Sequence, residues 1–330
     1  MPPVRQAMQY NNNTKMKRIL IPLLLAACTI SGPAVAQTTG KTSSTIFAPV
    51  YSPEIPSSVT LCSEKIDLDR ADMYEAFDRE LTSIAYTHGA TMLMIKRANR
   101  YFPELSELLK KNNMPQDLLY LACVESSLNP RAYSPAKAAG FWQFIPSAAK
   151  EYGLEVNDEV DERYNIEKAT AAAARYLKKA YNRYGNWPSA LASYNGGMAR
   201  ITNALDKQGA DTSLDLYLAE ETTRYPYRVM AMKTILENPR AYGFRLRADQ
   251  LYQPRKYKTV EVSGPVASWP DWAEAHGISY AQLREDNPWI RSFKLTNKTG
   301  KTYQVRVAEP SSLSRSKAGF KTFNPKWTTD

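Results

Sequence analysis

The sequence contains few of the residues from which metal centres and nucleophilic triads are built. Among its 330 residues are only two histidines, His88 and His276, and three cysteines. The histidines lie far apart, and neither has a cysteine or a carboxylate at ligand spacing around it. Zinc sites and serine–histidine–aspartate triads are therefore poorly supported, and we expect no metal site.

The N-terminal part has no apolar run of the roughly 20 residues that a membrane-spanning helix needs. Its apolar stretch, residues 19–30, follows Lys17-Arg18 and precedes Ala34-Val35-Ala36. A positive start, a short apolar core and a small-x-small site are typical of an export signal. We predict that residues 1–36 are a signal peptide and that the mature chain begins at Gln37.

A lipid anchor is the alternative within the same segment. Leu25-Ala26-Ala27-Cys28 resembles a lipobox, which would make Cys28 a lipidated N-terminus and attach the protein to a membrane. Twelve residues precede Cys28 when counted from Met16, and twenty when counted from Met8. We favour cleavage after Ala36. Both routes export the protein, to the periplasm or to the outer membrane or cell wall of a bacterium.

Acidic residues are outnumbered by basic ones. Loss of residues 1–36 removes four basic residues and no acidic ones, which lowers the formal net charge from +10 to +6. A mild positive charge suits an acidic partner such as the carboxylate-bearing cell wall or an anionic membrane face, although a solvated surface gives the same charge. We expect a monomer that does not bind nucleic acid.

Two cysteines, Cys62 and Cys123, remain in the mature chain. An exported protein can pair them in a disulfide. Cys123, however, lies within an apolar helical pattern, where a free buried thiol is the commoner finding. We favour free thiols and keep the disulfide as the alternative.

The chain is predicted to be mainly α. Residues 37–60 are rich in serine, threonine and proline and are predicted to be a flexible linker. Residues 61–245 are predicted to form one helical domain, because no convincing alternating strand occurs between 64 and 243. Helices are predicted over residues 70–102, from Pro103, from Pro115, and over 166–184, 188–195, 198–205 and 221–236.

A small α+β domain follows at residues 256–310. Strands are predicted at 259–262 and 303–307, with helices at 269–276 and 280–285 between them. This order, and "AEAHGISYAQLREDNPW" at 273–289, resemble a LysM module. "SGPVASWPDW" departs from that family's usual Gly-Asp-x-Leu turn, so we expect a degenerate module with weak glycan affinity that can be removed without loss of chemistry. Residues 311–330 are predicted to be a disordered basic tail.

One ionisable side chain, Glu125, stands in the apolar run "LACVESSLNP". On a helix that starts near Pro115 it falls in the last turn, where the helix dipole disfavours a negative charge. Its apolar neighbours also disfavour the anion, and both effects raise the pKa of a carboxyl. A carboxyl that stays protonated near neutral pH is what a general acid needs. A glutamate that reaches the surface or pairs with arginine is the alternative.

Three further motifs follow Glu125 along the chain. They read Gly140-Phe141-Trp142-Gln143, Ser193-Tyr194-Asn195 and Glu221-Thr222-x-x-Tyr225. Small residues allow close backbone approach, and aromatic rings beside amides are typical of sugar-binding surfaces. Each motif alone is weak, because aromatic residues at helical spacing usually belong to the core.

With Glu125-Ser126 these motifs resemble, in order, the catalytic pattern of the soluble-type (family 1) lytic murein transglycosylases. The resemblance covers residues 115–240 and implies a lysozyme-like fold of the goose-type and SLT kind. Two departures occur. Phe141-Trp142 replaces Leu-Met, which should reshape one wall of the cleft, and Ser193 replaces alanine.

The resemblance implies one catalytic carboxyl, Glu125, and no second, whereas ordinary glycosidases use two. It implies non-hydrolytic cleavage of the MurNAc–GlcNAc bond in peptidoglycan, without a cofactor. The resemblance implies that Ser126, Gln143, Asn195 and Tyr225 bind the substrate and position Glu125. Trp142 and Tyr194 are further candidates for substrate binding, by sugar stacking or cleft lining, with a core role as an equal alternative.

Two other functions stay open. The same fold can hydrolyse its substrate with further acids, for which Asp158, Glu159, Asp161 and Glu162 are candidates, although such a charge run is usually a solvated loop. Alternatively, the protein is a peptidoglycan-binding scaffold without activity. The retained Glu125, Gln143 and Asn195 argue against a scaffold.

Overall fold

The computed structural model describes residues 50–317 and 319–329, so the predicted signal peptide and lipobox lie outside the described residues. Two antiparallel strands, β1 (Ser58–Leu61) and β2 (Glu64–Asp67), come first. They contradict the prediction that the linker reaches residue 60 and that no strand follows it. Val59 and Leu61 are buried against the helical core, and this apolar burial orders the segment.

The helical domain continues with the elements α1 (Ala71–Tyr86), α2 (His88–Lys111), α3 (Leu118–Ser126), α4 (Pro146–Glu151), α5 (Ile166–Tyr184), α6 (Trp187–Gly196), α7 (Met198–Gln208) and α8 (Glu220–Glu237). The predicted helix at 166–184 is confirmed, and Gly185 ends it in the left-handed region (φ 68°). The predicted helix start at Pro103 is wrong, because Pro103 lies inside α2. Phe102 and Leu105 are buried beside it, which favours a continuous helix despite the roughly 3 kcal/mol that an interior proline costs.

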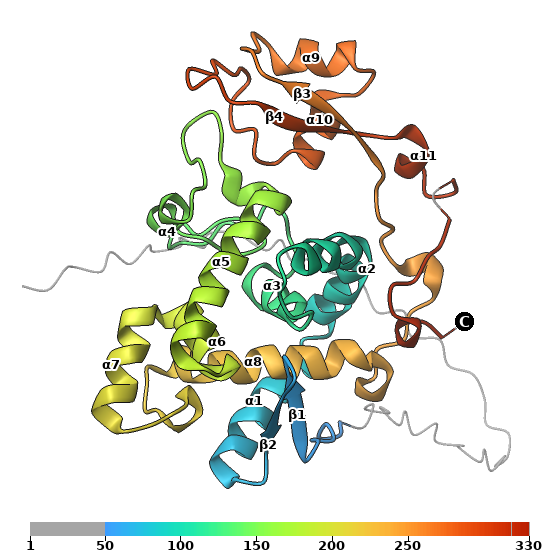
Figure 1. The fold of residues 1–330 in the computed structure, drawn as a ribbon. Coiled ribbons are helices and arrows are strands. Elements are labelled where there is room, and N and C mark those ends of the chain that lie inside the picture. The colour runs from blue at the N-terminus through green and yellow to red at the C-terminus, as the bar shows by residue number, and fades with distance from the viewer. Residues whose placement is uncertain (1–49, 318, 330) are drawn as a thin grey trace, which may run out of the picture. The chain divides into compact units, whose positions relative to one another are not determined.

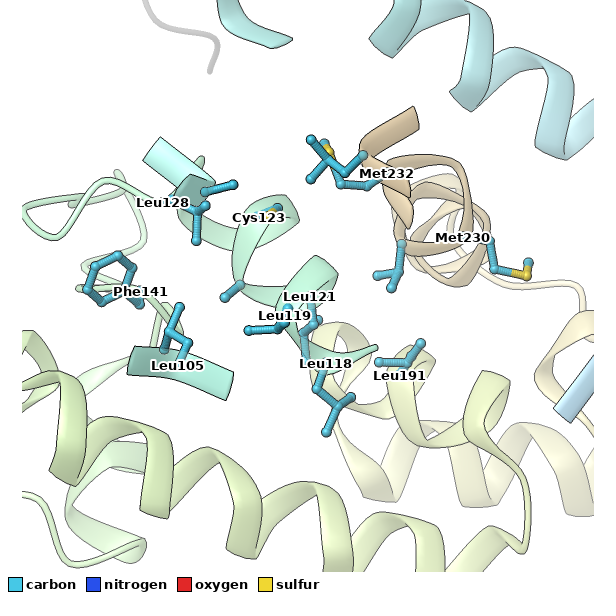
Figure 2. Packing of buried hydrophobic residues seen from close by; sticks show 14 of the residues in the cluster. Leu105, Leu118, Leu119, Leu121, Cys123, Leu128, Phe141, Leu191, Met230 and Met232 are labelled. Carbon is cyan, nitrogen blue, oxygen red and sulfur yellow. The ribbon is translucent and has the colours of Figure 1, made fainter. Parts of the chain in front are cut away.

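Helix α3 lies in the middle of the core. Figure 2 shows Leu105 of α2, Leu191 of α6 and Met230 of α8 around it. Within α3 the side chains of Leu121, Ala122 and Cys123 have no exposed surface. A helix buried on nearly all sides fixes the position of whatever it carries at its end. Cys123 and Cys62 are buried free thiols, so the disulfide is not formed.

The C-terminal module has the strand–helix–helix–strand order that its sequence predicts. Strands β3 (Tyr257–Val262) and β4 (Tyr303–Ala308) pair antiparallel, with Tyr257 opposite Ala308, and helices α9 (Trp269–Ala275) and α10 (Tyr280–Asp286) lie between them in the chain. Trp269, Leu283 and Val305 are fully buried in its own hydrophobic cluster. Figure 1 shows this module as one body of strands and short helices.

The tail beyond residue 310 is ordered where the structure describes it, so the prediction of a disordered tail is wrong there. It forms α11 (Pro310–Leu313) and a 3-10 turn at Pro325–Trp327, and it returns to the helical domain (Figure 1). Trp327 is 1% exposed, and its Nε1 donates a hydrogen bond to the Leu236 carbonyl at 2.6 Å. Its ring lies 5.8 Å from that of Phe102 in α2. The last residues therefore complete the core that holds α2 and α8.

We predict that Trp327→Ala destabilises the helical domain by about 3–5 kcal/mol, the cost typical of removing a large buried aromatic side chain. Denaturant unfolding of the full chain measures this. Phe320→Ala is the matched control, since Phe320 is 47% exposed and should change stability by less than about 0.5 kcal/mol. Equal midpoints for Trp327→Ala and the wild type would show that the tail adds nothing to the core.

Candidate active site

Glu125 and Ser126 are the last two residues of α3. Ser127 and Leu128 follow in left-handed conformations, each with φ 52°. Such conformations cost non-glycine residues on the order of 1–3 kcal/mol each and gather at functional sites. The Ser127 N–H closes the helix on the Cys123 carbonyl at 2.9 Å. The predicted position of Glu125 in the last turn of an apolar helix is confirmed.

Glu125 opens into a cleft of about 620 Å³. The segment 132–145, which we call the cleft loop, forms one side of it. The C-terminal end of α6 and the first turns of α8 form much of the remainder. The charged and polar side chains that line it are Glu125, Ser134, Gln143, Tyr176, Tyr194, Asn195, Glu221, Tyr225 and Arg228.

Burial sets the acidity of Glu125. Loss of solvation raises its pKa to about 7, and the nearby charge of Glu221 adds to the rise. Two groups oppose it. The Tyr225 hydroxyl donates a hydrogen bond to Glu125 Oε1, and the Arg228 guanidinium attracts the anion. A pKa of about 7 leaves comparable amounts of acid and base near neutral pH, so one carboxyl can both give and take a proton.

Sequence reasoning missed Arg228 and the residue that holds it. Arg228 Nε donates to Glu80 Oε2 at 3.1 Å, and Glu80 is 2% exposed on α1. Arg224 also donates to Glu80, so this buried carboxylate holds two cations of α8. Glu80 lies three residues after the buried Phe77, on the inner face of α1. An acid at a core position of an amphipathic helix is the sequence signal that could have identified Glu80.

Gln143 lines the cleft from a strained backbone, with φ 48°. Its Nε2 donates to the Gly140 carbonyl at 2.8 Å, which fixes the amide within the cleft loop. Gly140 itself has φ 75°, and a Cβ there would lie 2.0 Å from the Arg163 carbonyl oxygen. Only glycine fits that position, because the two backbones touch.

Asn195 and Tyr194 end α6 on the opposite side of the cleft. Asn195 Nδ2 donates to Glu221 Oε1 at 3.5 Å, and its Oδ1 accepts from the Thr222 hydroxyl at 2.9 Å. Tyr194 donates through its hydroxyl to the Trp142 carbonyl at 2.7 Å. These bonds hold the end of α6 against α8 and the cleft loop. The structure thus brings Glu125, Gln143, Tyr194, Asn195 and Tyr225 together.

Two predicted substrate-binding residues point elsewhere. Trp142 has no exposed surface, and its Nε1 donates to the Thr170 hydroxyl at 2.9 Å. Ser126 is 6% exposed and donates to the Ala122 carbonyl at 3.0 Å. Neither residue lines the cleft. Trp142 takes the core role, because its large apolar surface is buried more favourably under α5 than in water.

The acidic run 158–162 does not face Glu125, and the prediction of a solvated loop is wrong for its second half. Asp161 is 6% exposed and binds Arg163, with Oδ2 2.7 Å from Nη2. Glu162 is 3% exposed and pairs with Lys168. Glu159 accepts from Thr296 at 2.8 Å. The acid that does share the cleft with Glu125 is Glu221.

Two known protein families match parts of this chain. The transglycosylase SLT domain family matches residues 102–215, and the soluble lytic transglycosylase C-terminal LysM-like domain family matches residues 258–311. The resemblance read from the sequence motifs is confirmed.

Curated relatives agree as well. Membrane-bound lytic murein transglycosylase D of Escherichia coli K12 is 32% identical over 226 residues, which are 67% of this chain and 48% of that protein. A putative tributyltin chloride resistance protein of an Alteromonas species is 30% identical over 121 residues, 36% of this chain and 58% of that one. This chain spans about half the length of these relatives.

Solved structures show weaker similarity. The 70 kDa soluble lytic transglycosylase of Escherichia coli matches with a TM-score of 0.35 and 22% identity, covering 40% of this chain and 24% of that one. A complex of the 70 kDa soluble lytic transglycosylase with bulgecin A matches with a TM-score of 0.38 and 21% identity over 48% of this chain and 28% of that one.

We predict that Tyr225→Phe raises the pKa of Glu125 above its wild-type value of about 7. The hydroxyl bonds to the charged carboxylate, so its removal destabilises the anion. The carbon-13 shift of the Glu125 carboxyl, followed against pH, measures this without reference to activity. Tyr194→Phe is the matched control and should leave the titration in place, because that hydroxyl donates to a backbone carbonyl instead. An unchanged or lower midpoint in Tyr225→Phe would contradict the assigned contact.

Proposed function

Because residues 102–215 belong to the transglycosylase SLT domain family, we propose that this protein is a peptidoglycan lytic transglycosylase that remodels the cell wall. It cleaves the β-1,4 bond between MurNAc and GlcNAc and leaves 1,6-anhydroMurNAc ends. The observation that supports this most is Glu125 itself, a buried carboxyl with a pKa of about 7 at the wall of a cleft large enough for sugar rings.

The proposed reaction uses Glu125 twice. The protonated carboxyl gives its proton to the glycosidic oxygen while the bond from that oxygen to MurNAc C1 breaks. The resulting carboxylate then takes the proton of the C6 hydroxyl as O6 of the same sugar bonds to C1. Water is neither consumed nor released, and Glu125 ends protonated as it began. A pKa near 7 suits both steps.

The charge that develops on the sugar needs support other than a second carboxylate. The acetamido group of MurNAc can stabilise the oxocarbenium-like centre from within the substrate. In the cleft, Gln143 and Asn195 offer amides suited to the N-acetyl group, and Tyr194 offers a ring edge for the sugar. Tyr225 positions Glu125 through its hydroxyl. Ser126 supports the site through its hydrogen bond within the last turn of α3, and Trp142 supports it through its hydrogen bond to Thr170 in the core.

Hydrolysis by a muramidase is the second candidate, because Glu221 lines the same cleft. As a base it would deliver water to C1 and give reducing ends. Asn195 Nδ2 donates to Glu221 Oε1 at 3.5 Å, which holds this second carboxylate at the cleft. Arg228 stabilises the anion of Glu125, which either reaction forms. A non-catalytic scaffold would not need a carboxyl kept at the unfavourable end of a buried helix.

The proposed setting is the cell envelope. The substrate partner is the peptidoglycan glycan strand, and the mature protein is a monomer exported to the periplasm or the wall. Among the described residues, no helix combines the length and apolar character needed to cross a bilayer. Lipidation of Cys28 is the alternative to cleavage after Ala36.

We predict that Glu125→Gln lowers cutting of purified sacculi by at least 10³- to 10⁴-fold, since the amide keeps the shape and cannot transfer the proton. The variant should remain folded. Because burial raises the pKa of Glu125, ionisation opposes folding as pH rises from about 5 to 8, and at pH 8 the variant should melt at or above the wild-type temperature. Cutting at near wild-type rate by this variant would overturn the assignment of the acid.

Product analysis separates the two candidate reactions. Mass spectrometry of released muropeptides should find 1,6-anhydro ends, lighter by one water than hydrolysed ends. Glu221→Gln is the matched variant in the same cleft. Transglycosylation predicts that its products stay anhydro, whereas hydrolysis through Glu221 predicts reducing ends in the wild type that disappear in this variant.

We predict Gln37 as the principal N-terminus of protein recovered from cells, because the small-x-small site is the favoured cleavage position. Intact-mass analysis of the recovered protein measures this. A mature chain that starts at an acylated Cys28 would contradict cleavage after Ala36 and would show that the protein carries a lipid anchor.

A further inference from the structure

We propose that Arg163 is a positioning residue for the cleft and that the C-terminal LysM-like module completes the active site by holding the segment that carries Arg163. This rests on the proposed function, since the cleft loop supplies Gln143. It also reverses the expectation that the module can be removed without loss of chemistry. The assignment follows from three sets of contacts.

The first set joins Arg163 to the cleft loop. Arg163 is 5% exposed, and its Nη1 donates to the Lys137 carbonyl at 2.6 Å and to the Phe144 carbonyl at 3.0 Å. These carbonyls lie on the two arms of the loop, on either side of Gly140 and Gln143. The Ala139 N–H also donates to the Phe144 carbonyl, at 3.1 Å. One guanidinium therefore fixes the spacing of the two arms.

The second set fixes Arg163 itself. Its Nε and Nη2 bind the two carboxylate oxygens of Asp161 at 2.9 Å and 2.7 Å. Fork-to-fork pairing of this kind sets the plane of the guanidinium. A lysine has no such fork and cannot make all four contacts at once. The backbone of Arg163 also touches Gly140, where any Cβ would clash.

The third set attaches this segment to the module. The Asp161 N–H donates to the Trp289 carbonyl at 2.9 Å, and the Arg291 N–H donates to the Glu159 carbonyl at 2.8 Å. Val160 and Ile290 form an antiparallel bridge between these two bonds. Residues 159–161 thus pair with residues 289–291 as two short antiparallel segments, joined by backbone hydrogen bonds.

Apolar burial reinforces the attachment. Ala139 of the cleft loop, Val160 and Tyr164 are buried in the hydrophobic cluster of the module, together with Trp269 and Ile290. The Arg291 guanidinium lies 4.6 Å from the centre of the Tyr164 ring. The module therefore shares one core with the cleft loop, and weak glycan affinity would not make it dispensable.

The test compares two arginine-to-lysine variants at the same interface. Arg163→Lys breaks the contacts to both arms of the cleft loop. Arg306→Lys is the control, because Arg306 of β4 joins the module to the helical domain through Glu104 and Glu167 and does not touch the loop. Both keep the charge, and both are measured in the full chain on soluble glycan fragments.

We expect Arg163→Lys to lower kcat by about 10- to 100-fold, the size of effect that misplacement of a cleft group by about 1 Å produces. The pH midpoint of the Glu125 carboxyl should not move, since Arg163 does not contact it. Hydrogen exchange should quicken in residues 132–145 and stay unchanged in α5 and α8. Arg306→Lys should keep kcat within about twofold.

Glycine variants keep the proposal testable should Arg163→Lys not fold. Gly140 and Gly153 have nearly equal φ, 75° and 77°, so alanine strains both backbones alike. A Cβ at Gly140 meets the Arg163 carbonyl at 2.0 Å, whereas the nearest atom at Gly153 is 3.9 Å away. Gly140→Ala should lose cutting activity and should exchange amide hydrogens faster in residues 132–145. Gly153→Ala should change neither property.

Three results would overturn the proposal: wild-type kcat in Arg163→Lys, exchange that quickens evenly over the whole domain, or equal behaviour of the two glycine variants. Loop exchange is measured without substrate, so it tests the proposal even if the wild type cuts no peptidoglycan. In that case only the proposed function fails.

Discussion

The cleft is organised around a carboxyl that has lost its water. Helix α3 buries Glu125 at its C-terminal end, and both desolvation and the helix dipole favour the protonated form. If these acted alone the carboxyl would stay neutral and could not serve as a base. Tyr225 and Arg228 stabilise the anion in opposition, and their combined effect leaves the pKa at about 7. The chemistry depends on this balance.

Each group in that balance requires support of its own. Arg228 is held by Glu80, a buried carboxylate that α1 contributes. Glu80 in turn is tolerated in the core because Arg224 and Arg228 both bind it. The core around α3 is thereby joined to the cleft through ion pairs of α1 and α8. A tail residue, Trp327, packs between α2 and the end of α8 and steadies the same helices.

The module matches a LysM-like C-terminal domain family and also packs against the helical domain. Its core continues into residues 139, 160 and 164 of the helical domain, and its loop pairs with the backbone at 159–161. Domains of one chain move relative to each other by default unless their interface is large and hydrophobic, and here a hydrophobic cluster includes residues of both parts. The departure from the usual LysM turn at 263–272 is consistent with the proposed supporting role, which does not require that turn.

What the sequence determined by itself is local. Apolar periodicity located α5 to α8 and the two module strands, whereas the break between α1 and α2 was not predicted. An acid within an apolar run, followed by three motifs in order, singled out Glu125, Gln143, Asn195 and Tyr225, which line one cleft. The tertiary structure decided which side of each element faces the cleft. Trp142 and Gln143 are neighbours in the chain, yet Trp142 is buried in the core and Gln143 lines the cleft. The sequence also did not predict the roles of Arg228, the buried Asp161–Arg163 pair and Trp327. Their burial and pairing depend on segments that are distant in the chain and meet only when it folds.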